Sequence, residues 1–132
     1  MKETSRIASR FTNLREALAD KGLAQLGDTI INFAFSVAKT VRIGCPTGAR
    51  VDNQVLAQAA RQSGLRRIMG SRLDRHDIAD AAEAVLAFAW LRDLISIEEV
   101  VAILADRPSD ELVSMTRLIS EVIRRLEKIA MA

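Results

Sequence analysis

The segment spanning residues 78–91 constrains this chain more than any other, because it is almost wholly apolar and yet contains two carboxylates. Twelve of its fourteen residues are apolar, and the exceptions are Asp80 and Glu83. A separation of three places both side chains on one face of a helix, about one turn apart. Two carboxylates in apolar surroundings repel one another and lose their hydration. The segment therefore predicts a buried helix whose acidic side chains need a partner, either arginines or a hard cation such as Mg²⁺ or Mn²⁺.

A second apolar helix is predicted over residues 23–41, and it carries a carboxylate, Asp28, at the edge of its apolar stripe. That carboxylate is costly to bury unless it meets a partner or a cation. If the two helices pack side by side, Asp28 completes a cluster with Asp80 and Glu83. The apolar stripe itself recurs at helical spacing and consists of Leu23, Leu26, Ile30, Phe33, Ala34 and Val37.

The rest of the sequence also has a helical pattern. The 132 residues are 49% apolar and only 4% aromatic, which fits one domain with a single core over residues 1–132. Apolar positions recur at helical spacing in 1–20, and residues 109–131 carry a heptad seam that either closes the bundle or pairs with a second copy. No stretch alternates as a strand does. The prediction is an all-α bundle of about six or seven helices.

Several classes of site and location are excluded or disfavoured by composition. A single cysteine, Cys45, excludes an internal disulfide, and a single histidine, His76, excludes histidine-rich zinc sites. The chain has no glycine-rich phosphate loop and no CxxC pair. It has no apolar run as long as a membrane span, and its first residues lack the apolar core of a signal peptide. We therefore expect a cytoplasmic protein with no membrane partner.

Charge is unevenly distributed along the chain. Residues 39–75 carry eight Lys and Arg against two acids, whereas residues 76–132 carry six against eleven. This asymmetry favours an anionic partner that meets the basic part of the surface. Scattered, solvated charges explain the same distribution equally well.

Three segments, in order, resemble motifs of the ribonuclease III family. Residues 23–28, which end in Leu-Gly-Asp, resemble the signature helix of that family, and 79–84, Ala-Asp-Ala-Ala-Glu-Ala, are similar to its second acidic motif. Between them, 51–57 and the pair Gly64-Leu65 match the intervening Val-x-Asn-x-x-Leu-Ala and Gly-Leu patterns. The resemblance covers roughly residues 12–95, with the heptad helix lying beyond it.

The resemblance implies an all-α endonuclease domain that works as a homodimer. The implied reaction is hydrolysis of phosphodiester bonds in double-stranded or structured RNA, dependent on Mg²⁺ or Mn²⁺. Carried over by position, Asp28, Asp80 and Glu83 would be the metal-binding carboxylates, with Asp28 and Glu83 as the catalytic pair. The family usually has further acids one and two turns before the Leu-Gly-Asp aspartate, where this chain has Ala24 and Lys21. Residues 96–132 are too short and too helical for the double-stranded RNA-binding domain of larger members.

A basic connector before the acidic helix is the candidate surface for gripping the RNA. Contacts from such arginines to phosphates position a duplex without reading its bases, as shape-based recognition of double-stranded RNA requires. The scarcity of aromatic residues argues against stacking on single strands. The arginines in question are Arg61, Arg66, Arg67, Arg72 and Arg75.

Two alternatives to the nuclease stay open. One is a catalytically weak or inactive dimer of the same fold that binds RNA. In this alternative, Ala24 and Lys21 replace the acids that the family usually has, and metal binding is weakened. The other is a helical interaction protein, unrelated to RNA, whose functional surface is the heptad helix.

Overall fold

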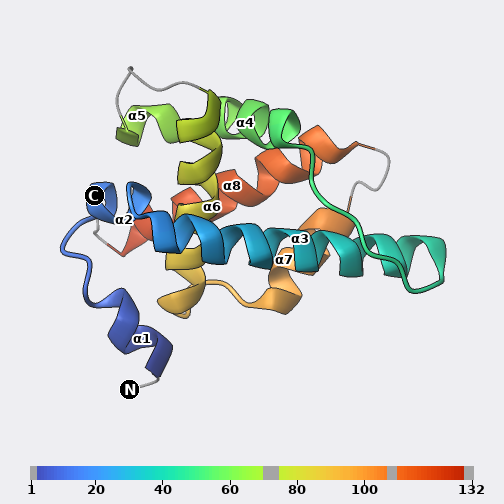
Figure 1. Ribbon diagram of the computed structural model, residues 1–132, viewed down its shortest axis with the longest axis horizontal. Coiled ribbons are helices and arrows are strands. Elements are labelled where there is room, and N and C mark those ends of the chain that lie inside the picture. Colours follow the sequence, from blue (N-terminus) through green and yellow to red (C-terminus); the bar gives the residue numbers. More distant parts are fainter. Residues whose placement is uncertain (1–2, 70–74, 107–109, 130–132) are drawn as a thin grey trace.

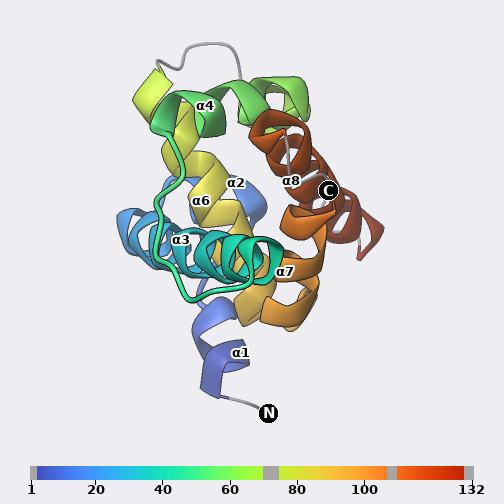
Figure 2. The same ribbon diagram turned by 90° about the vertical axis from the view of Figure 1, so that its right-hand side faces the viewer.

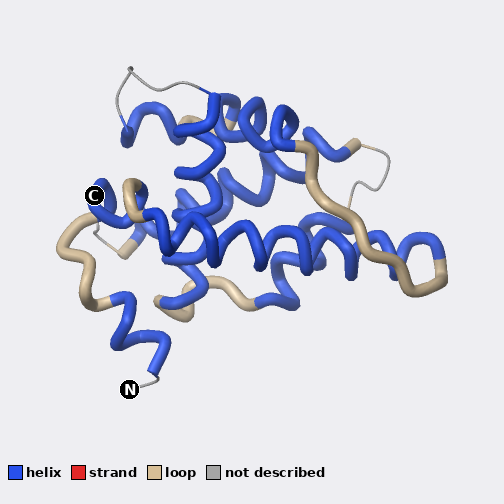
Figure 3. The backbone as a smooth tube through the Cα atoms, in the orientation of Figure 1, coloured by secondary structure: helices blue, strands red, loops and turns tan. Residues whose placement is uncertain are grey.

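The computed structural model describes residues 3–69, 75–106 and 110–129, and within these ranges all regular structure is helical (Figures 1 and 3). The predicted all-α fold is confirmed. The described helices, in chain order, are α1 (Glu3–Ala8), α2 (Leu14–Leu18), α3 (Lys21–Ile43), α4 (Asn53–Gln62), α5 (Leu65–Met69), α6 (Arg75–Leu91), α7 (Ile97–Ala105) and α8 (Glu111–Lys128).

The described part of the chain holds eight helices, against the six or seven predicted. One difference is that residues 1–20 do not form a continuous helix. The side chain of Asn13 accepts a hydrogen bond from the backbone N–H of Glu16 at 2.8 Å and so caps a new helix, α2. The other difference is the short helix α5 inside the basic connector. Gly64, with φ +86°, separates α4 from it.

Helices α3 and α6 form the centre of the molecule. They cross one another and make the largest interhelical contact, while α4, α7 and α8 pack around them (Figures 1 and 2). Helix α6 is buried along nearly its whole length, as its composition predicts. Its most deeply buried large side chains are Ile78, Val85, Leu86 and Phe88. The rings of Phe11 and Phe88 meet in a T-shaped arrangement with centroids 5.9 Å apart, so the turn before α2 also belongs to this core.

The predicted apolar stripe of α3 is only partly correct: Leu23, Ile30 and Ala34 are buried, Leu26 and Val37 are partly exposed, and Phe33 is 57% exposed. Ile31 and Phe35 are buried in the core instead. The helix is rotated relative to the prediction because α6 crosses α3 on the side of Gly27, where the two backbones approach closely. None of the helices that the structure describes is long and apolar enough to cross a membrane.

Helix α8 closes the bundle. Its apolar side chains at heptad spacing, Met115, Ile119, Val122 and Leu126, are buried within the same chain. They pack against α4, α7 and α6. Of the two roles considered for this helix, closure of the bundle is the one that the structure shows.

Local caps fix the ends of several helices. Asp52 accepts hydrogen bonds from the N–H groups of α4. Ser96 and Glu99 form a capping box at the start of α7. Asp110 caps α8, and the preceding residue, Ser109, lies outside the described residues.

Arg125 on α8 ties three segments together. Its guanidinium donates to the backbone carbonyl of Leu94 at 2.8 Å and to Glu121 at 2.7 Å, and it forms an ion pair with Glu99 at 2.7 Å. The ion pairs with Arg124 and Arg125 hold the pKa of Glu121 at about 2. Arg125 therefore fastens the turn that follows α6 and the start of α7 to α8.

Candidate active site

Asp28 and Glu83 meet because Gly27 lets two helices approach one another closely. A Cβ atom at position 27 would lie 1.9 Å from the backbone carbonyl oxygen of Glu83. A side chain at position 27 would therefore force α3 and α6 apart. The next residue of α3, Asp28, is consequently placed beside the side chain of Glu83, with which it shares a hydrogen bond.

Glu83 is a buried acid: only 7% of the residue is exposed, and it is one of the few buried polar residues among those that the structure describes. Burial, which disfavours the charged carboxylate, is the largest cause that raises the pKa of Glu83, to about 8. The hydrogen bond to Asp28 and the charges of Asp28 and Asp80 contribute to the same rise in pKa, and the charge of Arg50 opposes it. At neutral pH and without a cation, Glu83 therefore holds a proton that it donates to Asp28.

Asp28 is held from two sides. The side-chain amide of Asn32, one turn later in α3, donates to the backbone carbonyl of Asp28 at 2.8 Å and to its Oδ1 at 3.0 Å. The guanidinium of Arg50 lies 3.4 Å from the Oδ2 of Asp28, with the two side chains 75% and 41% exposed. An ion pair this exposed contributes about 0–1 kcal/mol to folding. Arg50 therefore matters more for the charge of the site than for stability.

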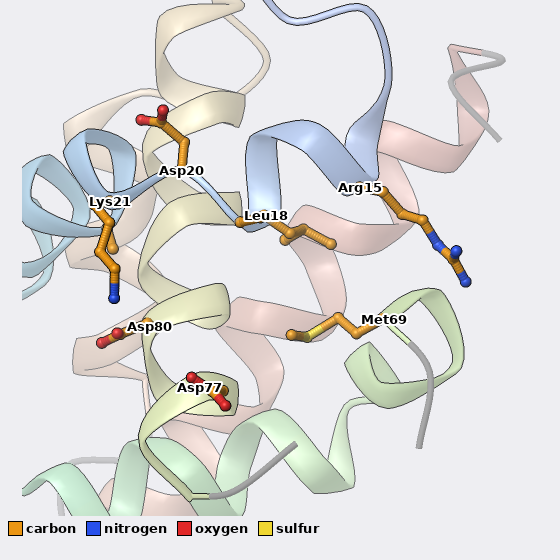
Figure 4. A pocket seen from close by; sticks show the side chains of 9 residues that line it. Arg15, Leu18, Asp20, Lys21, Met69, Asp77 and Asp80 are labelled. Carbon is orange, nitrogen blue, oxygen red and sulfur yellow. The ribbon is translucent and has the colours of Figure 1, made fainter. Parts of the chain in front are cut away.

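Asp80 lines a pocket of about 380 Å³ between α2, α5 and the first turns of α3 and α6. Ala24, at a position where the family motif usually has an acid, forms part of its wall. Lys21 extends towards Asp80 across this space (Figure 4). The remaining lining residues are Arg15, Leu18, Ala19, Asp20, Met69 and Asp77.

The structure brings together two of the three predicted metal ligands. Among the residues it describes, no three His, Cys, Asp or Glu side chains are grouped so that they could hold a metal ion. Asp28 and Glu83 share a hydrogen bond, and Asp80 is close enough for its charge to raise the pKa of Glu83. Asp80 as a third ligand stays a prediction.

The pair nevertheless fits a hard divalent cation. Mg²⁺ is commonly held by one or two carboxylates and keeps several of its waters. A buried acid that holds a proton against a neighbouring carboxylate is a site where a cation would replace that proton and relieve the repulsion. The donor set, two neighbouring carboxylates, suits Mg²⁺ or Mn²⁺ better than a soft metal.

The predicted basic connector is only partly described. Arg61, in the last turn of α4, is exposed and donates to Gln58 at 2.9 Å. Arg66 and Arg67 are exposed on α5, which packs against α4. Arg72 lies outside the described residues, and Arg75 belongs to the first turn of α6, where only the backbone is described. The three described arginines thus lie on two adjoining helices beside the start of α6 (Figure 1).

Two residues of the site were missed by the sequence analysis. Asn32 is not part of the predicted apolar stripe, and its side chain contacts both Asp28 and the loop that follows α3. Arg50 was counted only in the overall charge, because the sequence does not reveal that residues 44–52 run back along α3 (Figure 3). The i, i+4 spacing of Asp28 and Asn32 was the one available signal.

Comparison with known proteins gives one result that bears on this site. The sequence profile of a family described as Ribonuclease III matches residues 21–132, which include every helix from α3 to α8. No match was found among curated proteins.

Proposed function

Because this chain belongs to the ribonuclease III family of ribonucleases, we propose that it is a metal-dependent endoribonuclease that hydrolyses phosphodiester bonds in double-stranded or structured RNA. The observation that carries the proposal is the placement of Asp28 beside Glu83, on helices that Gly27 holds in close contact. These two side chains are the proposed catalytic pair.

Asp28 and Glu83 would hold Mg²⁺ or Mn²⁺, with Asp80 as the proposed third ligand. When bound, such an ion supplies an activated water and polarises the phosphoryl oxygen. The chain itself does the positioning. Asn32 fixes the carboxylate of Asp28 through its Oδ1, and the surrounding apolar residues of α6 keep bulk water away from Glu83.

The RNA-contacting surface in this proposal is the basic connector. Arg61, Arg66 and Arg67 are exposed and lie near the start of α6, the helix that carries Glu83. Arg72 and Arg75 extend the same stretch of sequence towards α6. Phosphate contacts from these arginines would position a duplex by its backbone and would weaken steeply with added salt.

A homodimer is part of the proposal, with α3 as its contact helix. Phe33 is exposed, and Leu26, Val37 and Val41 fall on the same side of α3 at helical spacing without being fully buried. Exposed apolar residues gathered on one helix face are typical of a protein contact. The heptad face of α8 is already covered within the chain, which supports α3 over α8 in this role.

A second candidate is an RNA-binding dimer of the same fold without catalysis. Lys21 favours it, because its ammonium extends towards Asp80 in the pocket where the family motif usually has acids (Figure 4). A positive charge there weakens the attraction of Asp80 for a metal ion. The third possibility, an interaction protein that acts through the heptad face of α8, loses its support because that face is buried.

The test is incubation of the purified protein with a labelled RNA duplex in Mg²⁺, in Mn²⁺ and in chelator. Glu83→Gln removes the charge of the buried acid, and Glu98→Gln, at an exposed position on α7, is the matched control. The proposal predicts cleavage that requires a divalent ion, is lost in Glu83→Gln and is retained in Glu98→Gln. Salt-sensitive duplex binding without cleavage under any condition would instead favour the RNA-binding dimer.

A further inference from the structure

The loop that follows α3 is fastened to that helix on both sides of Arg50. On one side, the hydroxyl of Ser36 donates to the carbonyl oxygen of Ala49 and accepts from its N–H, each at 2.9 Å. On the other side, the N–H of Val51 donates to Oδ1 of Asn32 at 2.7 Å. The backbone of residue 50 is therefore held between two anchors on α3.

The same anchors aim Arg50 at the carboxylate pair. Asn32, which holds Val51 with its oxygen, holds Asp28 with its nitrogen. The guanidinium of Arg50 then lies 3.4 Å from the Oδ2 of Asp28. Asn32 thus holds both the carboxylate of Asp28 and the backbone next to Arg50. The hydrogen bonds of this one side chain place Arg50 within reach of Asp28.

The contact is well placed but weak. The Arg50 side chain is 75% exposed, so little is lost when it leaves Asp28. A cation bound to Asp28 would neutralise the carboxylate and remove the attraction that keeps Arg50 there. Arg50 would then be a free guanidinium, which binds the oxygens of a phosphate in a planar, two-pronged fashion.

We propose that Arg50 binds a non-bridging oxygen of the phosphate at which the RNA is cut, and that it rests on Asp28 when no cation is bound. This inference rests on the proposed nuclease function and adds a phosphate-binding residue to it. Arg50 neutralises negative charge on the phosphate during hydrolysis and releases Asp28 to the cation. The cation and Arg50 compete for Asp28, so loss of Arg50 has opposite effects on ion binding and on cleavage.

The experiment compares Arg50→Met, which keeps the length of the side chain but removes the charge, with Arg50→Lys. Arg117→Met is the matched control, because Arg117 also forms an exposed ion pair with an aspartate, Asp106, at the end of α7. For each protein, the Mn²⁺ dissociation constant is measured by calorimetry without RNA. The kcat/KM for duplex cleavage is measured over a series of salt concentrations.

For Arg50→Met we expect Mn²⁺ to bind several-fold more tightly and kcat/KM to fall by at least about tenfold. The slope of log kcat/KM against log salt concentration should become shallower by about one, as for the loss of one phosphate contact. Arg50→Lys should recover part of the loss in kcat/KM, and Arg117→Met should behave as the wild type.

Two results would overturn the role of Arg50. A joint fall of Mn²⁺ affinity and kcat/KM in Arg50→Met would make Arg50 a mere support for Asp28, and unchanged values would leave it no role at the site. Both results presuppose an active wild type. A wild type that cuts no duplex in Mg²⁺ or Mn²⁺ defeats the nuclease proposal itself, so the two failures are distinguishable.

Discussion

Gly27 lies against the backbone carbonyl of Glu83, and a Cβ atom at position 27 would approach that oxygen to 1.9 Å. The obstacle is backbone, which cannot rotate away as a flexible side chain would. This contact sets the separation of α3 and α6, and with it the separation of the two acids on which the proposed chemistry depends.

Gly27→Ala is expected to destabilise the protein by about 3 kcal/mol or more, because the two central helices must move apart. Divalent-ion binding should be lost with it, since Asp28 is carried away from Glu83. Gly48→Ala is the control, because a Cβ atom there meets nothing within 4 Å, and its effect should stay within about 0.5 kcal/mol. Urea unfolding of the three proteins measures the difference. Equal stabilities would show that the contact is not tight.

Glu83 is expected to make the ion-free protein less stable as the pH rises. Its pKa in the folded protein is about 8, above the unfolded value, so the folded state binds the proton more tightly. The stabilisation that this proton contributes is fully present below the pKa of the unfolded state. It is lost as the pH rises from there to about 8, at no more than about 1.4 kcal/mol per pH unit.

Glu83→Gln cannot titrate and should not show this loss. Thermal or urea unfolding in chelator, from about pH 5 to about pH 9, compares it with the wild type and with Glu98→Gln. As the pH rises, the wild type and Glu98→Gln should lose stability relative to Glu83→Gln. If the unfolding free energies of all three proteins changed in parallel with pH, the pKa of Glu83 would not be raised in the folded protein.

Binding of Mg²⁺ or Mn²⁺ is expected to release a proton from Glu83 at neutral pH, because the cation needs the charged carboxylate. Affinity should therefore rise by up to about tenfold per pH unit below about pH 8 and level off above it. Calorimetry at about pH 7 in two buffers of different ionisation enthalpy counts the protons released, and the expected number is close to one. Affinity independent of pH over this range would place the ion elsewhere.

Arg125→Met is expected to cost about 1–3 kcal/mol of stability, because it leaves the carbonyl of Leu94 and the carboxylate of Glu99 without a guanidinium and Glu121 with only that of Arg124. Arg124 is the adjacent control. It pairs with Glu121 but is more exposed, at 55% against 26% for Arg125, so Arg124→Met should cost less than about 1 kcal/mol. Denaturant unfolding at neutral pH compares the loss of unfolding free energy in the two variants. Similar losses would contradict the role of Arg125 in holding α7 and the preceding turn against α8.

Features that depend on local sequence were predictable. The apolar run predicted over residues 78–91 appears in the structure as the buried helix α6. The caps at Asp52 and at Ser96 with Glu99 likewise depend only on residues within the first turn of each helix. The break before α2 also had a local signal, because Asn13 precedes Glu16 by three residues in the manner of a helix cap. The pairing of Asp28 with Glu83 was accessible only through the assumption that their helices pack together.

Features that depend on the path of the chain in space were not predictable. Whether Phe33 faces the core or the solvent is decided by the side on which α6 crosses α3, and periodicity does not specify that side. Arg50 reaches Asp28 because hydrogen bonds to Ser36 and Asn32 fold its loop back along α3. Loop courses of this kind depend on partners distant in sequence.

The two acids of the proposed site belong to helices that are separated in sequence by α4 and α5, so neither half of the chain contains the site by itself. During synthesis, a chain that ends before α6 has Asp28 but no Glu83 beside it and no close contact at Gly27. Contacts between distant segments also form late in folding, because the intervening chain must first be ordered. Under the proposed function, RNA cleavage would therefore begin only after α6 has packed against α3. A chain that ends before α6 would not cleave RNA.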